Sequence, residues 1–263
     1  MFDQKIVVSE MLDVLLLSYK QQTSTMFLGA SGVGKSATIE TFANTIAPNQ
    51  PNNLIDIRLC MKSIEQVGGV LMPKELPNGS FVLQTALPEE YECLFDPDYK
   101  GVLLFDEFPS ALPSIQNVAY QVTWDRVLGG RKLSDGVAVC LAGNLHTNGG
   151  KTYNILKPIL NRVKAYEIDS NSEAALEDWL NTFAYHSNIH PAFIGFLEQN
   201  PSLLNTNDVD NKPNQPFMSG RSIEAASKDL YAIEQGEISE RLGWISINGL
   251  LNESHAADFK KYY

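Results

Sequence analysis

The chain has 263 residues, a length that allows one large domain or two smaller ones. Hydrophobic residues make up 44% of it and charged residues 19%, which is typical of a globular protein and excludes a disordered or fibrous one. The net charge of −11 disfavours binding to nucleic acid or to an anionic membrane, and the longest apolar stretches, Leu12–Leu17 and Val102–Phe105, are too short to cross a bilayer.

The first two thirds of the chain predict strands that alternate with helices. Continuous apolar runs indicate buried strands, and apolar residues at every third or fourth position indicate helices. Strands separated by helices need crossover connections, so we expect a mostly parallel five-stranded sheet flanked by helices. Residues 77–90, with Asn78-Gly79 as a turn signal, predict a short hairpin. The predicted strands are 26–28, 54–59, 102–106, 137–142 and 165–168, and the predicted helices are 9–20, 37–46 and 114–128.

After Asp169 the sequence no longer alternates between predicted strands and helices. Helical patterns cover 172–186, 189–199 and 221–235, and the polar segment 205–216 predicts a long loop. We therefore predict two domains, an α/β domain over residues 1–170 and a smaller α-helical domain over residues 171–263.

The most specific motif is Gly29-Ala30-Ser31-Gly32-Val33-Gly34-Lys35-Ser36, a full match to the phosphate-binding pattern G-x-x-x-x-G-K-[ST]. Its glycines let backbone N–H groups turn toward phosphate oxygens, Lys35 brings a positive charge to the outer phosphates, and the Ser36 hydroxyl can bind Mg²⁺. The run lies between an apolar strand and a helix, as the motif requires. We therefore predict a P-loop NTPase whose phosphate-binding residues are Gly29, Ala30, Ser31, Gly32, Val33, Gly34, Lys35, Ser36 and Ala37.

Two more strands end in polar residues that suit phosphate chemistry. Asp106 would hold Mg²⁺ together with Ser36, and Glu107 would orient or deprotonate an attacking water. Asp106 could instead cap the next helix. Asn144 follows the strand 137–142, where its amide could position the same water, although a turn is the usual role of asparagine there.

Two arginines are candidates for contact with the γ-phosphate. Arg162 precedes the last predicted strand, and Arg221 opens the helix 221–235. An arginine can stabilise the charge on the γ-phosphoryl oxygens in the transition state, from the same chain or from a neighbouring subunit. Taken singly, each arginine could equally form a surface or interdomain ion pair.

The order of these motifs resembles that of the AAA+ ATPases, and within them the MoxR-like and dynein-related group. The resemblance covers residues 5–235. It implies Walker B at Asp106 and Glu107, sensor 1 at Asn144, an arginine finger at Arg162 and sensor 2 at Arg221. The catalytic residues would then be Glu107, Asn144, Arg162 and Arg221, and the metal ligands Ser36 and Asp106.

Other segments bear on the subgroup. Residues 57–69 resemble the stretch that follows the second strand in MoxR-like proteins, and residues 126–136 resemble their pre-sensor hairpin. Arg126 or Arg131, at that hairpin, is an alternative to Arg162 as the finger. The sequence departs from the MoxR-like pattern where Phe-Pro-Ser follows Asp-Glu in place of Ile-Asn-Arg.

The resemblance implies a subunit that binds ATP or ADP with Mg²⁺, hydrolyses ATP in a homo-oligomeric ring, a hexamer, and remodels or chaperones a protein complex. No guanine-selecting [NT]-K-x-D motif is present, which favours ATP over GTP. Three isolated cysteines suit a reducing compartment, so we expect a cytoplasmic protein, and the Asn-rich, Pro-punctuated style suits a phage. Two alternatives stay open: a nucleotide-gated assembly protein with slow turnover, and an ATP-driven nucleic-acid motor.

Overall fold

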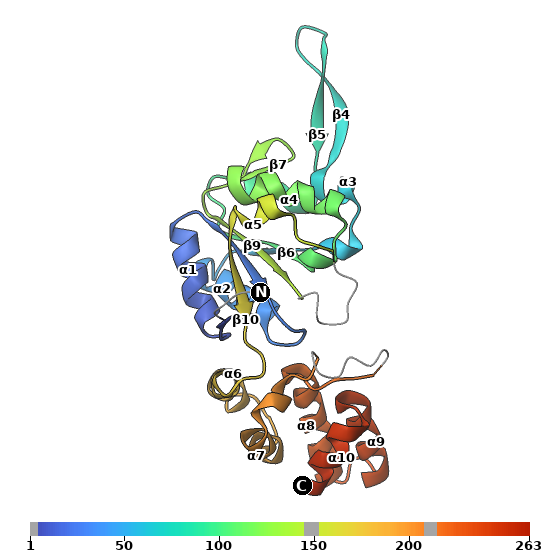
Figure 1. Cartoon of the computed structure of the whole chain (residues 1–263). Coiled ribbons are helices and arrows are strands. Elements are labelled where there is room, and N and C mark those ends of the chain that lie inside the picture. Colours follow the sequence, from blue (N-terminus) through green and yellow to red (C-terminus); the bar gives the residue numbers. More distant parts are fainter. Residues whose placement is uncertain (1–4, 145–152, 208–214) are drawn as a thin grey trace.

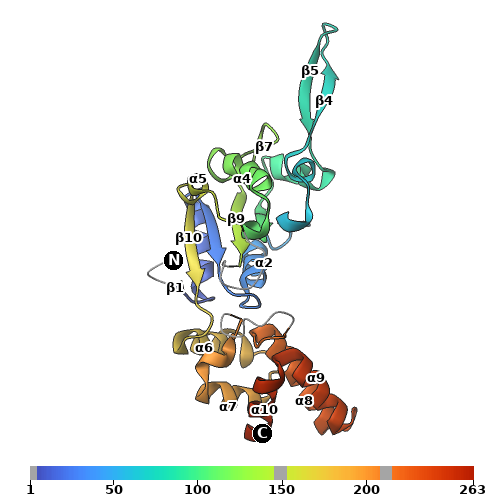
Figure 2. The ribbon, with the colours of Figure 1, turned by 45° about the vertical axis from the view of Figure 1, so that its right-hand side comes forward.

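A computed structural model describes residues 5–144, 153–207 and 215–263. An α/β part ends at Ile168 and a helical part begins at Glu173, while a long hairpin projects from the α/β part on the side away from the helical part (Figure 1, Figure 2). This architecture confirms the predicted fold class. The domain boundary at residue 170 stays a prediction, and residues 208–214 of the predicted loop lie outside the described residues.

The central sheet is parallel, with six strands in the order β1-β10-β2-β9-β6-β3. Five were predicted; the sixth, β1, is a two-residue edge strand, too short to produce a sequence pattern. Because the strands are parallel, the residues that follow β2, β9 and β6 lie side by side at one edge. The strands are β1 (Lys5–Ile6), β2 (Ser24–Leu28), β3 (Leu54–Arg58), β6 (Gly101–Asp106), β9 (Val137–Gly143) and β10 (Val163–Ile168).

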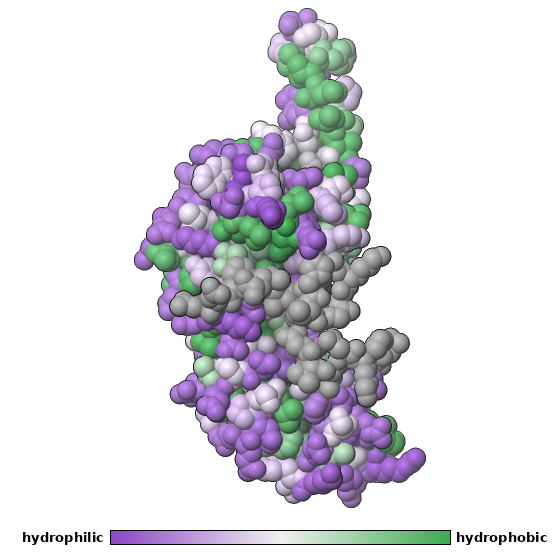
Figure 3. All heavy atoms as spheres, viewed as in Figure 1, coloured by the Kyte–Doolittle hydropathy of each residue, from purple (hydrophilic) through white to green (hydrophobic). Residues whose placement is uncertain are grey.

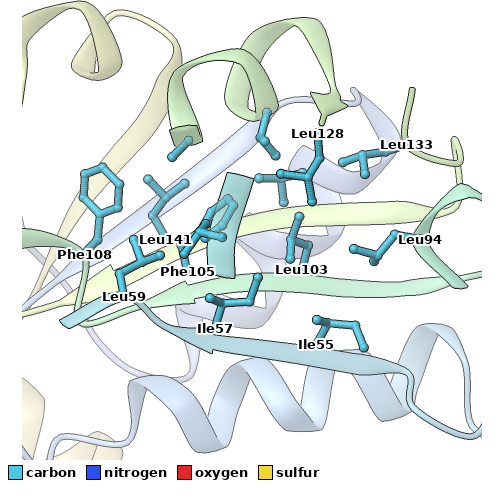
Figure 4. Close-up of a cluster of buried hydrophobic side chains, with 14 of the residues drawn as sticks. Ile55, Ile57, Leu59, Leu94, Leu103, Phe105, Phe108, Leu128, Leu133 and Leu141 are labelled. Carbon is cyan, nitrogen blue, oxygen red and sulfur yellow. The ribbon is translucent and has the colours of Figure 1, made fainter. Parts of the chain in front are cut away.

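Helices cover both faces of this sheet because successive side chains of each buried strand point to opposite faces. Leu103 and Phe105 belong to the cluster beneath α3, α4 and α5 (Figure 4), whereas Val102 and Leu104 pack with α1 and α2. Burial of one such side chain stabilises the fold by about 1.5–3 kcal/mol. The helices are α1 (Glu10–Lys20), α2 (Lys35–Ile46), α3 (Ile64–Gly68), α4 (Pro113–Asp125) and α5 (Lys157–Leu160).

Helix α4 ends at Asp125, so the predicted end at residue 128 is wrong. Arg126 has a left-handed backbone (φ +55°) and its guanidinium donates to the carbonyl oxygens of Ser134 and Val137, at 2.9 and 2.6 Å. These tertiary hydrogen bonds turn the chain into a small antiparallel hairpin, β7 (Val127–Leu128) with β8 (Arg131–Lys132).

The hairpin predicted at 77–90 is longer and starts earlier than expected. Strands β4 (Val70–Glu75) and β5 (Phe81–Ala86) form a separate two-stranded sheet, and Gly79 (φ +80°) lies in the predicted turn. Its large apolar side chains are exposed to solvent, and they form an apolar surface along the projecting strands (Figure 3). We call this set the hairpin surface: Val70, Leu71, Met72, Phe81, Val82 and Leu83.

The helical part has its own apolar core, with Phe193 stacked on Phe259 at 3.8 Å between ring centroids. The predicted helix 172–186 ends at Trp179 and continues as a π-helical turn, Leu180–Ala184. Two helices at the end of the chain were not predicted. None of the described helices is long and apolar enough to cross a membrane. The helices of this part are α6 (Glu173–Trp179), α7 (Pro191–Gln199), α8 (Gly220–Glu234), α9 (Glu240–Leu251) and α10 (Glu253–Tyr262).

Candidate nucleotide site

The phosphate-binding motif forms the loop between β2 and α2. Gly32 (φ +78°) and Gly34 (φ +104°) have left-handed backbones, which glycine adopts without the steric cost that a Cβ brings. Gly34 occupies the N-cap of α2, a helix of 12 residues, so the positive end of the helix dipole lies at the loop. The local geometry is that of a site for anionic phosphate groups.

Lys35 is buried at the base of this loop, with 8% of its surface exposed. Its ammonium group donates to the carbonyl oxygens of Gly29 (3.0 Å) and Ala30 (2.9 Å) and to Oδ1 of Asn144 (3.3 Å). Burial lowers the pKa of Lys35 to about 8, although the carboxylates of Asp106 and Glu107 oppose that shift. A bound phosphate would place a negative charge in contact with this buried ammonium and so stabilise its charged form.

Ser36 and Asp106 form a pair of oxygen donors beside Lys35. The Ser36 hydroxyl donates to Oδ2 of Asp106 at 3.1 Å, and Oδ1 of Asp106 accepts from the backbone N–H of Glu107 at 2.8 Å. Mg²⁺ prefers oxygen ligands and is commonly bound by one or two carboxylates together with phosphates. A hydroxyl and a carboxylate at this distance, next to a phosphate loop, fit that donor set.

Glu107 and Asn144 come from neighbouring strands. Glu107 directly follows β6, is half-buried and has a left-handed backbone (φ +54°), which is uncommon for a residue with a Cβ and is frequent at functional sites. Asn144 follows β9, between β2 and β6 in the sheet. The parallel topology therefore brings Lys35, Asp106, Glu107 and Asn144 to one edge.

The helical part contacts the phosphate loop at Ser31 and Gly32 and brings Arg221 close to it. Arg221 is the second residue of α8, and a Cβ added to Gly32 would lie 3.7 Å from the Arg221 Cβ and 2.9 Å from the Ser219 hydroxyl. The charge of Arg221 contributes to the lowered pKa of Lys35. The exposed Arg221 side chain thus belongs to the same region as the loop.

Arg162 lies elsewhere. It directly precedes β10, and the pairing of Val163 with Ser24 puts it at the amino edge of the sheet, away from the phosphate loop. Its guanidinium stacks on the Tyr120 ring, 3.6 Å from the centroid, and donates to the Tyr120 hydroxyl. About 13 Å separates this end of β2 from Leu28, at about 3.3 Å per residue.

The two alternative arginines have other partners. Arg126 is buried and holds the β7–β8 hairpin through its bonds to backbone carbonyls. Arg131 forms an ion pair with Glu92 at 2.5 Å and lies over the Phe95 ring.

Sequence reasoning missed one residue of this region. Asn205, 2% exposed, donates from Nδ2 to the carbonyl oxygen of Ser31 at 2.9 Å. It lies in a segment that the sequence marks only as a polar loop rich in asparagine, and nothing in that pattern distinguishes it from its neighbours.

The strand order, the phosphate loop and the helical C-terminal part define an α/β fold of the P-loop kind, with a parallel sheet flanked by helices. No protein-family model and no curated protein matches the sequence. Among solved structures, the chain is similar to Hsp104 in its closed state with ATPγS and FITC casein, with a TM-score of 0.52 and 17% identity over 86% of this chain and 44% of that one. The ADP complex of Hsp104 from S. cerevisiae gives a TM-score of 0.49 and 17% identity over 89% of this chain and 47% of that one. The chain thus spans about half the length of these structures, and the likeness is one of fold.

Proposed function

We propose that this chain is a Mg²⁺-dependent ATPase of the AAA+ type. The observation that carries the proposal is the contact of the phosphate loop with the ends of two neighbouring strands. Lys35 donates to Oδ1 of Asn144 at 3.3 Å, and Ser36 donates to Oδ2 of Asp106 at 3.1 Å. These four residues come from three separate segments of the chain, and each is of the type that phosphoryl transfer needs at that position.

The residues at this edge of the sheet have separate roles in ATP binding and hydrolysis. Backbone N–H groups of residues 29–37 and the ammonium of Lys35 bind the phosphates, while Ser36 and Asp106 would hold Mg²⁺, which when bound would supply positive charge against the phosphate oxygens. Glu107 accepts a proton from the attacking water, and Asn144 orients that water. Arg221 binds the γ-phosphate from the helical part, so the helical part, residues 171–263, acts as a lid over the phosphate loop.

We further propose that the site is completed by a second copy of the chain in a ring, with Arg162 as the arginine finger. Arg162 cannot reach its own phosphate loop, because the length of β10 separates them. Its position at the opposite edge suits contact with the site of a neighbour in a head-to-tail ring, and a hexamer is the expected closure. Arg126 is less suited because its guanidinium is buried and bound by two backbone carbonyls, and Arg131 because the carboxylate of Glu92 neutralises its charge. The Tyr120 side chain that Arg162 contacts is neutral.

The task proposed for the ring is remodelling of a protein complex, as in the MoxR-like group. Support comes from the hairpin surface, where Phe81 and Leu83 are each 67% exposed on a projecting two-stranded sheet. Such a hairpin is marginally stable in water by itself, and exposed apolar surface of this kind is typical of a protein contact. The observed β7–β8 hairpin also agrees with the pre-sensor hairpin of that group.

The test is to measure ATP turnover and nucleotide binding in three proteins: wild type, Lys35→Ala and Glu107→Gln. We expect Lys35→Ala to lose binding, and Glu107→Gln to bind ATP while its kcat falls by about 10²–10⁴-fold, the usual contribution of a general base. Binding without turnover in the wild type, at every protein concentration, would favour the nucleotide-gated assembly protein. Stimulation by DNA that falls steeply with salt would favour the nucleic-acid motor.

A further inference from the structure

The crest of the phosphate loop, Ser31 and Gly32, is held from two sides by the helical part. On one side the buried side chain of Asn205 donates to the Ser31 carbonyl oxygen at 2.9 Å. On the other side Ser219, the N-cap of α8, packs so closely on Gly32 that a Cβ there would lie 3.0 Å from the Ser219 Cβ.

The two contacts belong to one unit of the helical part. Oδ1 of Asn205 accepts from the backbone N–H of Asn207 at 3.1 Å, which fixes the orientation of the amide. The backbone N–H of Thr206 donates to the carbonyl of Met218, and the N–H of Met218 donates to the Thr206 hydroxyl, both at 3.0 Å. Asn205 and Ser219 therefore cannot move independently of each other.

The Asn205 contact acts on the loop through the planarity of the peptide bond. The Ser31 carbonyl and the Gly32 N–H belong to one trans peptide unit, so they point in opposite directions. A donor that fixes the carbonyl therefore also fixes the direction of the N–H, which belongs to the phosphate-binding loop. With glycine at φ +78°, this peptide is otherwise free to turn.

We infer that Asn205 is a positioning residue: it holds the Ser31–Gly32 peptide in the orientation that binds phosphate, and it links the position of the helical part to the nucleotide. The inference rests on the proposed nucleotide site. It goes beyond that site because Asn205 acts on the loop and on no reacting atom.

The chain offers a matched control for the test. Asn200 also donates its Nδ2 to a carbonyl oxygen at 2.9 Å, but that oxygen belongs to Phe196 within α7, away from the loop. Asn→Asp at either position replaces the donor by an oxygen without changing the shape of the side chain. Both variants lose one hydrogen bond of the same kind, and only Asn205→Asp loses the one to the loop.

The experiment measures the Kd of Mg-ADP by titration calorimetry, the thermal midpoint, and KM and kcat for ATP. Without its donor the Ser31–Gly32 peptide can turn away in the nucleotide-free protein, and nucleotide binding then has to restore an orientation that leaves the carbonyl unpaired, at a cost of about 1–3 kcal/mol. We therefore expect Asn205→Asp to bind Mg-ADP about 5- to 150-fold more weakly. KM should rise with Kd while kcat at saturation stays within about twofold, because binding is lost equally from the ground state and the transition state. Asn200→Asp should keep Kd and KM.

Two outcomes would overturn the inference: a Kd of Asn205→Asp equal to that of the wild type, or equal weakening in both variants, which would mean general damage to the helical part. Asn205→Ala, which brings no new charge, gives the same test if Asn205→Asp does not fold. Lys35→Ala in the same assay separates the two proposals. If the wild type does not bind Mg-ADP, the proposed function fails; if it binds and Lys35→Ala does not, only the role of Asn205 is at stake.

Discussion

Replacement of Arg162 by alanine tests whether the active site is shared between two protomers. The residue lies at the amino edge of the sheet, about 13 Å along β2 from the start of the phosphate loop, so an effect on turnover has to come from a neighbouring site. An arginine finger contributes about 10³–10⁵ in kcat in phosphoryl transfer, and we expect a loss in that range. The fold should survive, because the stacking on Tyr120 that is removed is worth about 0.5–1 kcal/mol.

The decisive assay mixes two inactive variants. Arg162→Ala keeps an intact phosphate loop, and Lys35→Ala keeps an intact Arg162. In a head-to-tail ring assembled at random from equal amounts of both, about one quarter of the interfaces combine an intact loop with an intact arginine. The mixture should therefore recover about a quarter of the wild-type rate per subunit, and the wild-type rate should rise steeply with protein concentration.

Either of two results would refute the shared site: Arg162→Ala alone keeps the wild-type rate at every concentration, or Arg162→Ala is inactive and the mixture with Lys35→Ala recovers no activity. Arg131→Ala serves as the comparison, because Arg131 is a surface residue paired with Glu92. If Arg131→Ala loses turnover and Arg162→Ala does not, the finger lies on the β7–β8 hairpin. Arg162→Lys keeps the charge but not the planar group, and should remain strongly impaired.

The geometry supports four further predictions. The pKa of Lys35 is lowered to about 8 from an ordinary 10.5, so Lys35 should take up a proton when phosphate binds above about pH 8, but not below pH 7. Calorimetry in buffers of different ionisation enthalpy detects this uptake. The unfolded chain holds this proton more tightly, so the Lys35 contribution to the free energy of unfolding of the nucleotide-free protein rises between about pH 8 and 10.5. Gly32→Ala should lower the free energy of unfolding by more than Gly130→Ala does. Both glycines have φ near +80°, where a Cβ costs about 1–2 kcal/mol, but only a Cβ at Gly32 would also collide with the helical part. Equal losses of the free energy of unfolding in denaturant titrations would contradict this close packing. Phe81→Ser with Leu83→Ser should leave basal ATPase activity unchanged and weaken binding of a fluorescein-labelled unfolded test protein, measured by anisotropy. Unchanged binding would remove the hairpin surface as a protein contact.

Local signals in the sequence locate the residues of the candidate phosphate site, but they do not locate the residues that surround it. The loop is contiguous, so its eight-residue motif specifies both residue types and backbone shape. Asp106 and Asn144 could be placed because a buried strand followed by a polar residue is visible in the sequence, and parallel strands present such residues at one edge.

Elements that depend on contacts between distant residues were not predictable in the same way. Helix α4 ends before Arg126 because the Arg126 guanidinium donates to the carbonyls of Ser134 and Val137. The apolar pattern continues past that point, so the sequence alone predicts a later end. Strand β4 contains Pro73 and is exposed along its length, so it lacks the alternation of a half-buried strand. Asn205 reaches Ser31 across 174 positions of sequence, and its residue type alone fits any turn.

The position of β10 gives the proposed ring a physical basis. This strand is parallel to β2, so the residue that precedes it must lie at the amino edge, and the segment that follows it must leave at the carboxyl edge. Arg162 therefore lies away from the loop, while the helical part, entered after Ile168, reaches it and holds Ser31 through Asn205. A single protomer can thus supply the lid contact but not the second arginine. An active monomer would have to obtain that charge from Arg221 alone, and such a monomer would show a concentration-independent rate that Arg221→Ala abolishes and Arg162→Ala leaves unchanged.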